Sequence, residues 1–298
     1  MHLFTIVIDE NIEDFQTRLN SQIQSLVDDG IGIEEKIEFD KPFYILKYGI
    51  DIEHLNDYPI VDIVNIFRYC IANTVFEYIK YYKEPQLINK ILNYDYYYFD
   101  IDERSKIEER IDSYMKNESY VDILQNESQK RITKMFIDYL KNNSVINING
   151  FITFRLKEYV LGLQEIVDRA VESFLMDQEY NEFIKLLRYF VDIQEPKYEV
   201  LNILFEEDER YQLYDEFGNV INNEYLNIIE AELDASINHD DLLISSLITI
   251  APNEIYIHKI DNLKNMDLIQ TISKIFQDRI ILCDNCQWCR IHTNIKKE

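Results

Sequence analysis

Three cysteines close to the C-terminal end of the sequence are the residues best suited to chemistry: Cys283, Cys286 and Cys289, each separated from the next by two residues. Thiolates at such short spacing converge where the chain turns, and zinc in proteins is bound by cysteine sulfur and histidine nitrogen. Structural zinc sites usually take their ligands from two separate stretches of chain. The cluster therefore predicts a metal site whose fourth ligand comes from elsewhere.

His258 is the candidate for that fourth ligand because of where its surroundings place it. The pattern predicts a strand, a helix and a second strand: residues 254–258, 262–276 and 279–283. Such a β-α-β crossover joins parallel neighbours, so His258 and Cys283 both lie at carboxyl ends of strands, the edge at which ligands gather. His258 is therefore preferred to His292. The alternative is an ordinary strand histidine with a hydrogen bond of its own.

The same cysteines fit three other interpretations. Closely spaced cysteines resemble part of an iron–sulfur pattern, although one ligand is missing, and a Cys-x-x-Cys pair is typical of redox-active thiols. The third interpretation is a cysteine-rich tail without a ligand. Zinc or an iron–sulfur cluster is thus the cofactor that the sequence suggests. Cys70 stands alone in a helical pattern and is interpreted as a small core residue.

No sequence motif for catalysis accompanies this cluster. The chain contains no Gly-rich phosphate loop, no Gly-x-Ser-x-Gly and no His-Glu-x-x-His, the motifs of phosphate binding, serine hydrolases and zinc proteases. We therefore assign no catalytic residues and expect a non-enzymatic interaction protein. The alternative is a redox or sensor protein that binds zinc or an iron–sulfur cluster through Cys283, Cys286, Cys289 and His258.

The middle of the sequence has the strongest helical pattern. Apolar residues recur at steps of three and four in two runs, residues 151–175 and 179–193. This spacing is typical of helices with one buried face. We expect a break from Met176 to Gln178, with Asn149 as the N-cap of the first helix. Two adjacent helices of this kind predict a hairpin that buries Leu163 and Leu187 deeply.

These helices also carry a resemblance to a known family. The runs INGFITFRLKEY, VDRAVESFL and EYNEFIKLLRYFVDIQEP, followed by DDLLISSLITIAPNEIYIH and FQDRIILCDNCQWC, resemble the YtxC-like family of proteins linked to sporulation. The resemblance covers the second half of the chain. It implies a soluble, sporulation-linked protein of a spore-forming bacterium, and it implies no catalytic residues.

Strand and helix patterns over the whole chain predict a helix-rich α+β fold. The first fifty residues predict a small β-α-β-β unit, and residues 56–143 are helical in pattern throughout. Strands return after Pro196, so the C-terminal part combines the helical hairpin with a mixed sheet that contains the crossover. The Asn-Asn-Ser run around Asn143 marks the expected boundary between two domains, residues 1–145 and 146–298.

Acidic residues outnumber basic ones by 55 to 30, which gives a formal charge of −25. A field of this sign repels phosphate backbones and anionic membranes, so neither nucleic acid nor a membrane is expected as a partner. Residues 195–241 hold fourteen acidic and two basic residues. This segment is either a solvated face or a docking surface for a basic protein partner.

Three further patterns bear on class and location. The aromatic run Tyr94–Phe99 has no basic residues between its rings, so packing between helices is favoured over base stacking. No run of about 18 apolar residues occurs, so no transmembrane helix is expected. The N-terminal MHLFTIVIDEN lacks the basic start of a signal peptide. With cysteines too clustered for a disulfide framework, we expect a cytoplasmic protein.

Overall fold

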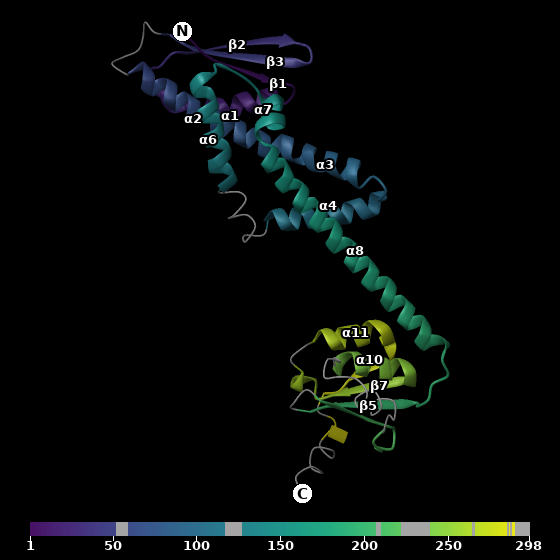
Figure 1. Ribbon diagram of the computed structural model, residues 1–298. Helices are drawn as coiled ribbons and strands as arrows, with labels where there is room; N and C mark the ends of the chain where they lie inside the picture. The colour runs from purple at the N-terminus through teal and green to yellow at the C-terminus, as the bar shows by residue number, and fades with distance from the viewer. Residues whose placement is uncertain are drawn as a thin grey trace. The chain divides into compact units, whose positions relative to one another are not determined.

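Two four-stranded mixed sheets organise the chain, and each lies in its own compact unit, Met1–Leu175 or Met176–Glu298. The computed structural model (Figure 1) describes residues 1–51, 59–116, 127–206, 210–221, 239–263, 266–284, 286, 288 and 289. The helix-rich α+β class is confirmed. The domain boundary expected near residue 145 lies inside the first unit, because Val145–Asn147 forms a strand of the first sheet.

The first sheet has the strand order β2-β3-β1-β4. Its strands are β1 (His2–Ile8), β2 (Ile33–Asp40), β3 (Phe43–Ile50) and β4 (Val145–Asn147). Together with α1 (Ile12–Asp28), the first three strands form the expected β-α-β-β unit, which is confirmed. The sequence did not predict β4, which has three residues and pairs in parallel with β1. Such a short strand gives too little alternation to be recognised.

Helices build most of the first unit, and some of them cover one face of its sheet (Figure 1). They are α2 (Ile60–Tyr78), the π-helix η1 (Ile79–Lys83), α3 (Glu84–Asp95), α4 (Ile101–Lys116), α6 (Glu127–Asn142) and α7 (Ile148–Arg155). Side chains from the sheet and from α1, α2, α6 and α7 share one core, in which Phe15, Phe67 and Phe136 are fully buried. Burying aromatic rings of this size contributes strongly to stability.

The longest helix differs from its prediction. Helix α8 runs without interruption from Lys157 to Ile193, so the expected break at Met176 to Gln178 is wrong. These residues, Met176, Asp177 and Gln178, include no glycine or proline and remain compatible with a helix. All three are exposed, so the gap in the apolar pattern marks an exposed stretch of helix rather than a turn. The chain instead turns at Leu156, which separates α7 from α8.

Burial along α8 follows the predicted period. In its first half, apolar side chains pack against α3 and α4: Ile166, Val167, Ala170, Val171 and Phe174. Leu163 is buried, as expected, whereas Leu187 is only partly buried and the deeply buried residues beside it are Ile184 and Val191. Ile184 and Val191 belong to the same predicted apolar stripe as Leu187, so the stripe was found but its most buried members were not.

The second sheet has the order β6-β5-β7-β8. Its strands are β5 (Val200–Phe205), β6 (Tyr211–Tyr214), β7 (Glu254–His258) and β8 (Ile280–Leu282), and its helices are α10 (His239–Ile250) and α11 (Asp267–Phe276). Strands β5, β7 and β8 are parallel neighbours, which confirms the predicted crossover from β7 through α11 to β8. The helix expected over residues 222–237 lies outside the described residues.

The two faces of this second sheet differ in what they meet. Leu201, Ile203 and Ile257 join the core with α10 and α11, and Figure 1 shows both helices over the sheet. Successive side chains of a strand point to opposite faces. Asn202 and His258, next to these residues in sequence, therefore lie on the other face, where the cysteines are found.

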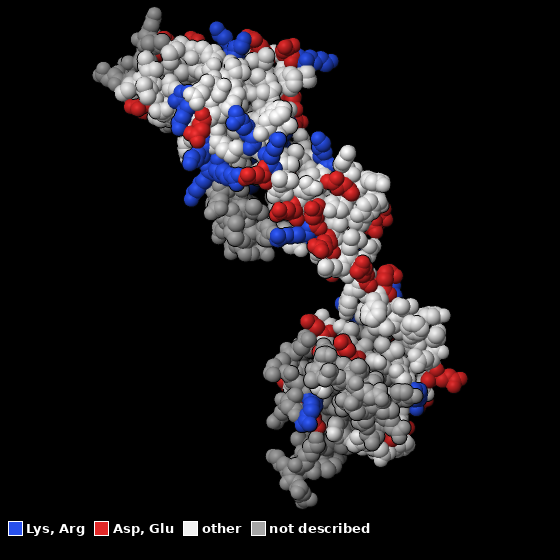
Figure 2. Space-filling model, viewed as in Figure 1, with Lys and Arg blue, Asp and Glu red and all other residues white. Residues whose placement is uncertain are grey.

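Charge is distributed over both units with both signs present. Figure 2 shows Lys and Arg side chains gathered over α6 and acidic side chains over α4 in the first unit. Much of the acidic stretch 195–241 lies outside the described residues. Among the helices that the structure describes, none combines the length and the apolar character needed to span a membrane.

Candidate metal centre

The parallel strands of the second unit bring His258 and Cys283 to the same edge. His258 is the last residue of β7, and Cys283 directly follows β8. The Cys283 backbone N–H donates to the Ile257 carbonyl at 2.9 Å, which extends the pairing of the two strands by one residue. Cys286 and Cys289 follow within six residues.

The four side chains converge on one point. One ligand atom from each of His258, Cys283, Cys286 and Cys289 lies within 4.8 Å of every other. His258 Nδ1 is 3.1 Å from Cys289 Sγ and 3.8 Å from Cys286 Sγ, and the Sγ atoms of Cys283 and Cys289 are 3.5 Å apart. The structure thus brings together all four residues that the sequence suggested.

These separations can be compared with a tetrahedral zinc site. With Zn–S near 2.3 Å and Zn–N near 2.0 Å, two sulfurs lie about 3.8 Å apart and a sulfur and a nitrogen about 3.5 Å apart. The two nitrogen–sulfur distances, 3.1 and 3.8 Å, bracket the expected value, and the sulfur–sulfur distance of 3.5 Å is slightly shorter than expected. The widest possible pair, at 4.8 Å, needs a contraction of about 1 Å to reach tetrahedral geometry.

Aromatic rings cover the cluster. The ring of Trp288 stacks on the His258 imidazole, with centroids 4.6 Å apart and planes 25° from parallel, and Tyr214 packs edge-on against Trp288. His258 and Cys289 are 2% and 3% exposed, whereas Cys283 and Cys286 are partly exposed. The site is therefore shielded on the side of the sheet and reachable on the side of the first two cysteines.

The pKa values of the Cys286 and Cys289 thiols are shifted in opposite directions. Burial, together with the neighbouring Cys283 and Cys286, raises the pKa of the Cys289 thiol to about 12. Burial also acts to raise the pKa of Cys286, but hydrogen bonds from the backbone N–H groups of Cys289 and Trp288 and from the other thiols outweigh it, and the pKa is lowered. Three sulfurs this close cannot all carry negative charge unless a cation lies between them.

Two residues of this site, Asn202 and Trp288, were not predicted from the sequence. Asn202 Oδ1 lies 3.0 Å from His258 Nε2, on the ring nitrogen that faces away from the cysteines. The signal for Asn202 was a single amide within the apolar strand Val200–Phe205, since a polar group buried there needs a partner. The expected alternative ligand, His292, lies outside the described residues.

A second cluster of charged groups lies in the first unit, at the ends of its own parallel strands. Lys83 Nζ is 2.7 Å from Asp9 Oδ1 and 2.8 Å from Glu10 Oε1. Asp9 and Glu10 directly follow β1, and Asn149, two residues after β4, donates from Nδ2 to Asp9 Oδ2 at 2.7 Å. Asn149 was the expected helix cap, but Asn147 caps α7 by accepting from the Gly150 N–H at 2.8 Å.

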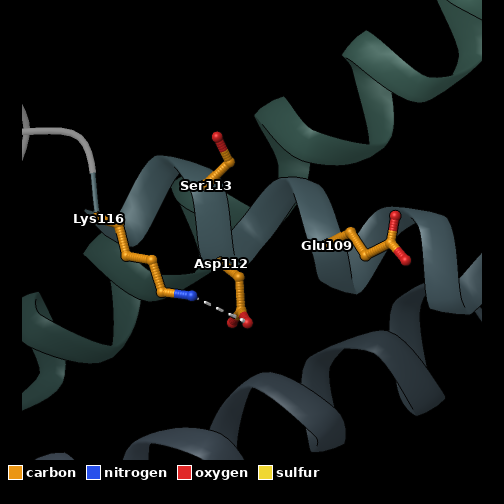
Figure 3. A pocket seen from close by; sticks show the side chains of 4 residues that line it. All are labelled: Glu109, Asp112, Ser113 and Lys116. Carbon is orange, nitrogen blue, oxygen red and sulfur yellow. Dashed lines mark ion pairs between the residues drawn. The ribbon is translucent and has the colours of Figure 1, made fainter.

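A surface hollow of about 560 Å³ lies along α4. Figure 3 shows that Glu109, Asp112, Ser113 and Lys116 line it from one helix, with an ion pair of 3.7 Å between Lys116 and Asp112. All four residues are exposed. Solvated side chains of a single helix provide no shielded donor set, so the cysteine cluster is the stronger candidate.

The aromatic run Tyr94–Phe99 divides between the core and the surface. Phe99 is buried against α8, and Tyr96 donates to Asp168 Oδ1 at 2.7 Å. Tyr94, Tyr97 and Tyr98 are exposed. Two of the five aromatic residues therefore contact neighbouring helices, as expected, and the other three are exposed.

Comparison with known proteins adds the following. The sequence profile described as the YtxC-like family matches residues 69–281. A protein of Bacillus subtilis (strain 168) printed as "Uncharacterized protein YtxC" is 30% identical over 205 residues, which cover 66% of this chain and 70% of that protein. No solved structure matches. The match begins far upstream of the second half, and its last residue precedes Cys283.

The chain therefore belongs to the YtxC-like family. The matched region contains His258 but none of the three clustered cysteines, so the assignment of the metal centre rests on the geometry of this chain alone.

Proposed function

We propose that this YtxC-like protein binds one zinc ion through His258, Cys283, Cys286 and Cys289. The observation that carries the proposal is the convergence of one nitrogen and three sulfurs within 4.8 Å, from residues that lie up to 31 positions apart. Three thiolates and one imidazole are a ligand set that zinc accepts in tetrahedral geometry. The widest separation in the set, 4.8 Å, must contract by about 1 Å when the ion binds.

The ion proposed here has a structural role. Sites with four protein ligands are closed, whereas catalytic zinc sites keep a position for water or substrate. Zinc would join the end of β7, the end of β8 and the turn that carries Trp288. It would thereby fix the C-terminal segment on the face of the second sheet.

An iron–sulfur cluster fits this arrangement less well. Such clusters distribute four cysteine ligands over several irons, so the ligands stand farther apart than donors that share a single ion. A set contained within 4.8 Å, with a histidine as one member, favours a single ion. The redox interpretation of the Cys-x-x-Cys pair is less favoured for the same reason, since the third thiol and the imidazole belong to the same set within 4.8 Å.

A different observation supports the prediction of a non-enzymatic interaction protein. The C-terminal half of α8 exposes apolar side chains at steps of three and four: Phe183, Leu186, Phe190 and Ile193. Apolar rows of this kind are typical of surfaces that meet other molecules. Sporulation, a cytoplasmic location and a basic partner remain predictions.

Metal analysis of protein purified without chelators and under anaerobic conditions tests the zinc proposal. We expect one zinc per chain. Cys286→Ser and Cys289→Ser should each lose the stoichiometric metal, and Cys70→Ser is the matched control because Cys70 lies in the core of the first unit. Zinc-free protein that also fails to take up added zinc would refute the proposal.

The chain offers a built-in reporter for the same experiment. Trp288 is the only tryptophan, and its ring stacks on the proposed ligand His258. Zinc titrated into metal-free protein should therefore change the tryptophan fluorescence with a 1:1 endpoint. The change should be retained in Cys70→Ser and lost in Cys289→Ser.

A further inference from the structure

We infer that Asn202 is the residue that positions His258 for metal binding, by holding its ring in the form whose Nδ1 carries a free lone pair. The inference rests on the proposed zinc site and deepens it. It follows from a chain of three hydrogen bonds that begins outside the site.

The first step fixes the Asn202 amide. Its Nδ2 donates to the Asp215 carbonyl at 3.1 Å. A carbonyl oxygen only accepts hydrogen bonds, so the amide cannot be turned the other way without placing two acceptors face to face. The Asp215 turn is itself held, because its side chain accepts from the N–H groups of Phe217 and Asn219 at 2.9 and 2.8 Å.

The second step fixes the proton on His258. With Nδ2 engaged by Asp215, the Oδ1 atom of Asn202 is the one that faces His258 Nε2, at 3.0 Å. An amide oxygen only accepts, so Nε2 must carry the hydrogen. In a neutral imidazole the other nitrogen, Nδ1, then has the lone pair.

The third step connects this tautomer with the cysteines. Nδ1 is the atom that lies 3.1 Å from Cys289 Sγ and 3.8 Å from Cys286 Sγ. The nitrogen left with a lone pair is therefore the one that points at the proposed ion. Metal-bound histidines usually donate their second ring N–H to an acceptor, which fixes the ring and raises its basicity.

Burial keeps water away from the hydrogen bond between Asn202 and His258. Asn202 and His258 are both buried, and they come from neighbouring parallel strands, with Asn202 opposite Tyr256 and Leu204 opposite His258. Trp288 covers the imidazole. Water therefore competes poorly for Nε2. The amide of Asn202 consequently determines which ring nitrogen of His258 carries the hydrogen.

Two substitutions separate positioning of His258 from support of the Asp215 turn. Asn202→Leu removes both hydrogen bonds. Asn202→Asp keeps an acceptor for His258 Nε2 and gives up the donor to Asp215. We expect zinc affinity to fall about 10- to 100-fold in Asn202→Leu and to stay within about threefold of wild type in Asn202→Asp. Asn253→Leu, at an exposed asparagine bonded to Glu199, is the matched control.

The deciding readout is the tautomer of His258 in the full chain, measured by nitrogen chemical shifts of selectively labelled histidine. Metal-free wild type should show the Nε2–H form, and Asn202→Leu should lose this preference. Equal loss of zinc affinity in Asn202→Asp and Asn202→Leu, or an Nδ1–H form in metal-free wild type, would overturn the inference. If wild type takes up no zinc, the zinc proposal fails, and the tautomer measurement still decides the role of Asn202.

Discussion

The two units place polar side chains at the same position of their sheets but satisfy them in different ways. In each sheet, parallel strands end side by side, and the residues just after or at those ends face one another: Asp9, Glu10 and Asn149 in the first unit, and His258 and Cys283 in the second. The first set has its cation within the chain, the buried Lys83. The second set consists of thiols and an imidazole, which suit a cation that comes from solution.

The comparison shows what separates a structural polar cluster from a ligand site. Lys83 ends the π-helix η1, and Lys83 and Glu84 are both buried. π-Helices occur often at functional sites, yet here the carboxylates and the ammonium neutralise one another at hydrogen-bonding distance. Thiols crowded together gain no such neutralisation from each other, as the raised pKa of Cys289 reflects.

The largest expected effect is on the second unit when zinc is removed. Free zinc at about 1,000 times its dissociation constant stabilises a protein by about 4 kcal/mol, which corresponds to roughly 10 °C or more in melting temperature for a unit of this size. Chelation should lower the transition reported by Trp288 fluorescence by this amount. Chelation should leave hydrogen exchange in β1 and α1 unchanged. An equal loss of protection in these elements would contradict the expectation that zinc acts on the second unit alone.

Replacement of Lys83 by Met is the matching experiment in the first unit. Removing one partner of a buried ion pair leaves the other charge uncompensated and costs about 3–5 kcal/mol. Asp9 and Glu10 are partly exposed, so we expect the lower end, about 3 kcal/mol. Chemical denaturation of Lys83→Met with and without chelator measures the loss in the free energy of unfolding. The loss should be the same under both conditions. A loss that depends on zinc would contradict the independence of the two clusters.

A smaller effect is expected from Asn149→Ala. Asn149 Nδ2 donates to the Asp9 carboxylate, and a hydrogen bond to a charged group contributes about 1.5–3 kcal/mol. Because Asp9 keeps Lys83, we expect a loss of about 1.5 kcal/mol in the free energy of unfolding. In the double variant with Lys83→Met, the two losses should not add, since both groups contact Asp9. Additive losses would show that the cluster does not act as one network.

The smallest effect concerns acid pH. Burial acts to raise the pKa of Asp9, but Lys83 and Asn149 outweigh it and hold the pKa below its usual value. The unfolded value is about 3.9, so the stabilisation is present above about pH 4 and is lost as the pH falls through the folded pKa. One group contributes at most about 1.4 kcal/mol per pH unit. The difference in stability between wild type and Asn149→Ala should shrink below pH 4, and a constant difference would contradict this.

The sequence predicted most of the second sheet and the four side chains that converge at its edge because those features have local signatures. The strands around His258 and Cys283 alternate with one amphipathic helix, and a crossover of this kind brings their carboxyl ends together. Asn202 escaped notice because its role depends on pairing between β5 and β7, which lie more than fifty residues apart. Trp288 was not predicted either, because its stacking on His258 depends on how the chain folds back after β8.

The helices show a different limit. The apolar period of α8 was visible, but the gap between its two apolar runs, from Met176 to Gln178, was mistaken for a break in a helix that continues to Ile193. Neither polar residues nor a widened stripe distinguishes an exposed helix face from a turn when glycine and proline are absent. The π-helix at Lys83 has no recognisable local signal either, and the hydrogen bonds of Tyr78 and Lys83 to Glu10 and Asp9 join residues 68 and 74 positions apart.

X-ray absorption at the zinc edge tests the central claim most directly. For zinc bound to the purified full-length chain, we predict a first shell of three sulfurs near 2.3 Å and one nitrogen near 2.0–2.1 Å. In Cys286→Ser, any zinc still bound should show fewer sulfurs, and Cys70→Ser should reproduce the wild-type spectrum. A shell of nitrogen and oxygen alone, or no zinc in the protein at all, would contradict the assignment of His258, Cys283, Cys286 and Cys289 as its ligands.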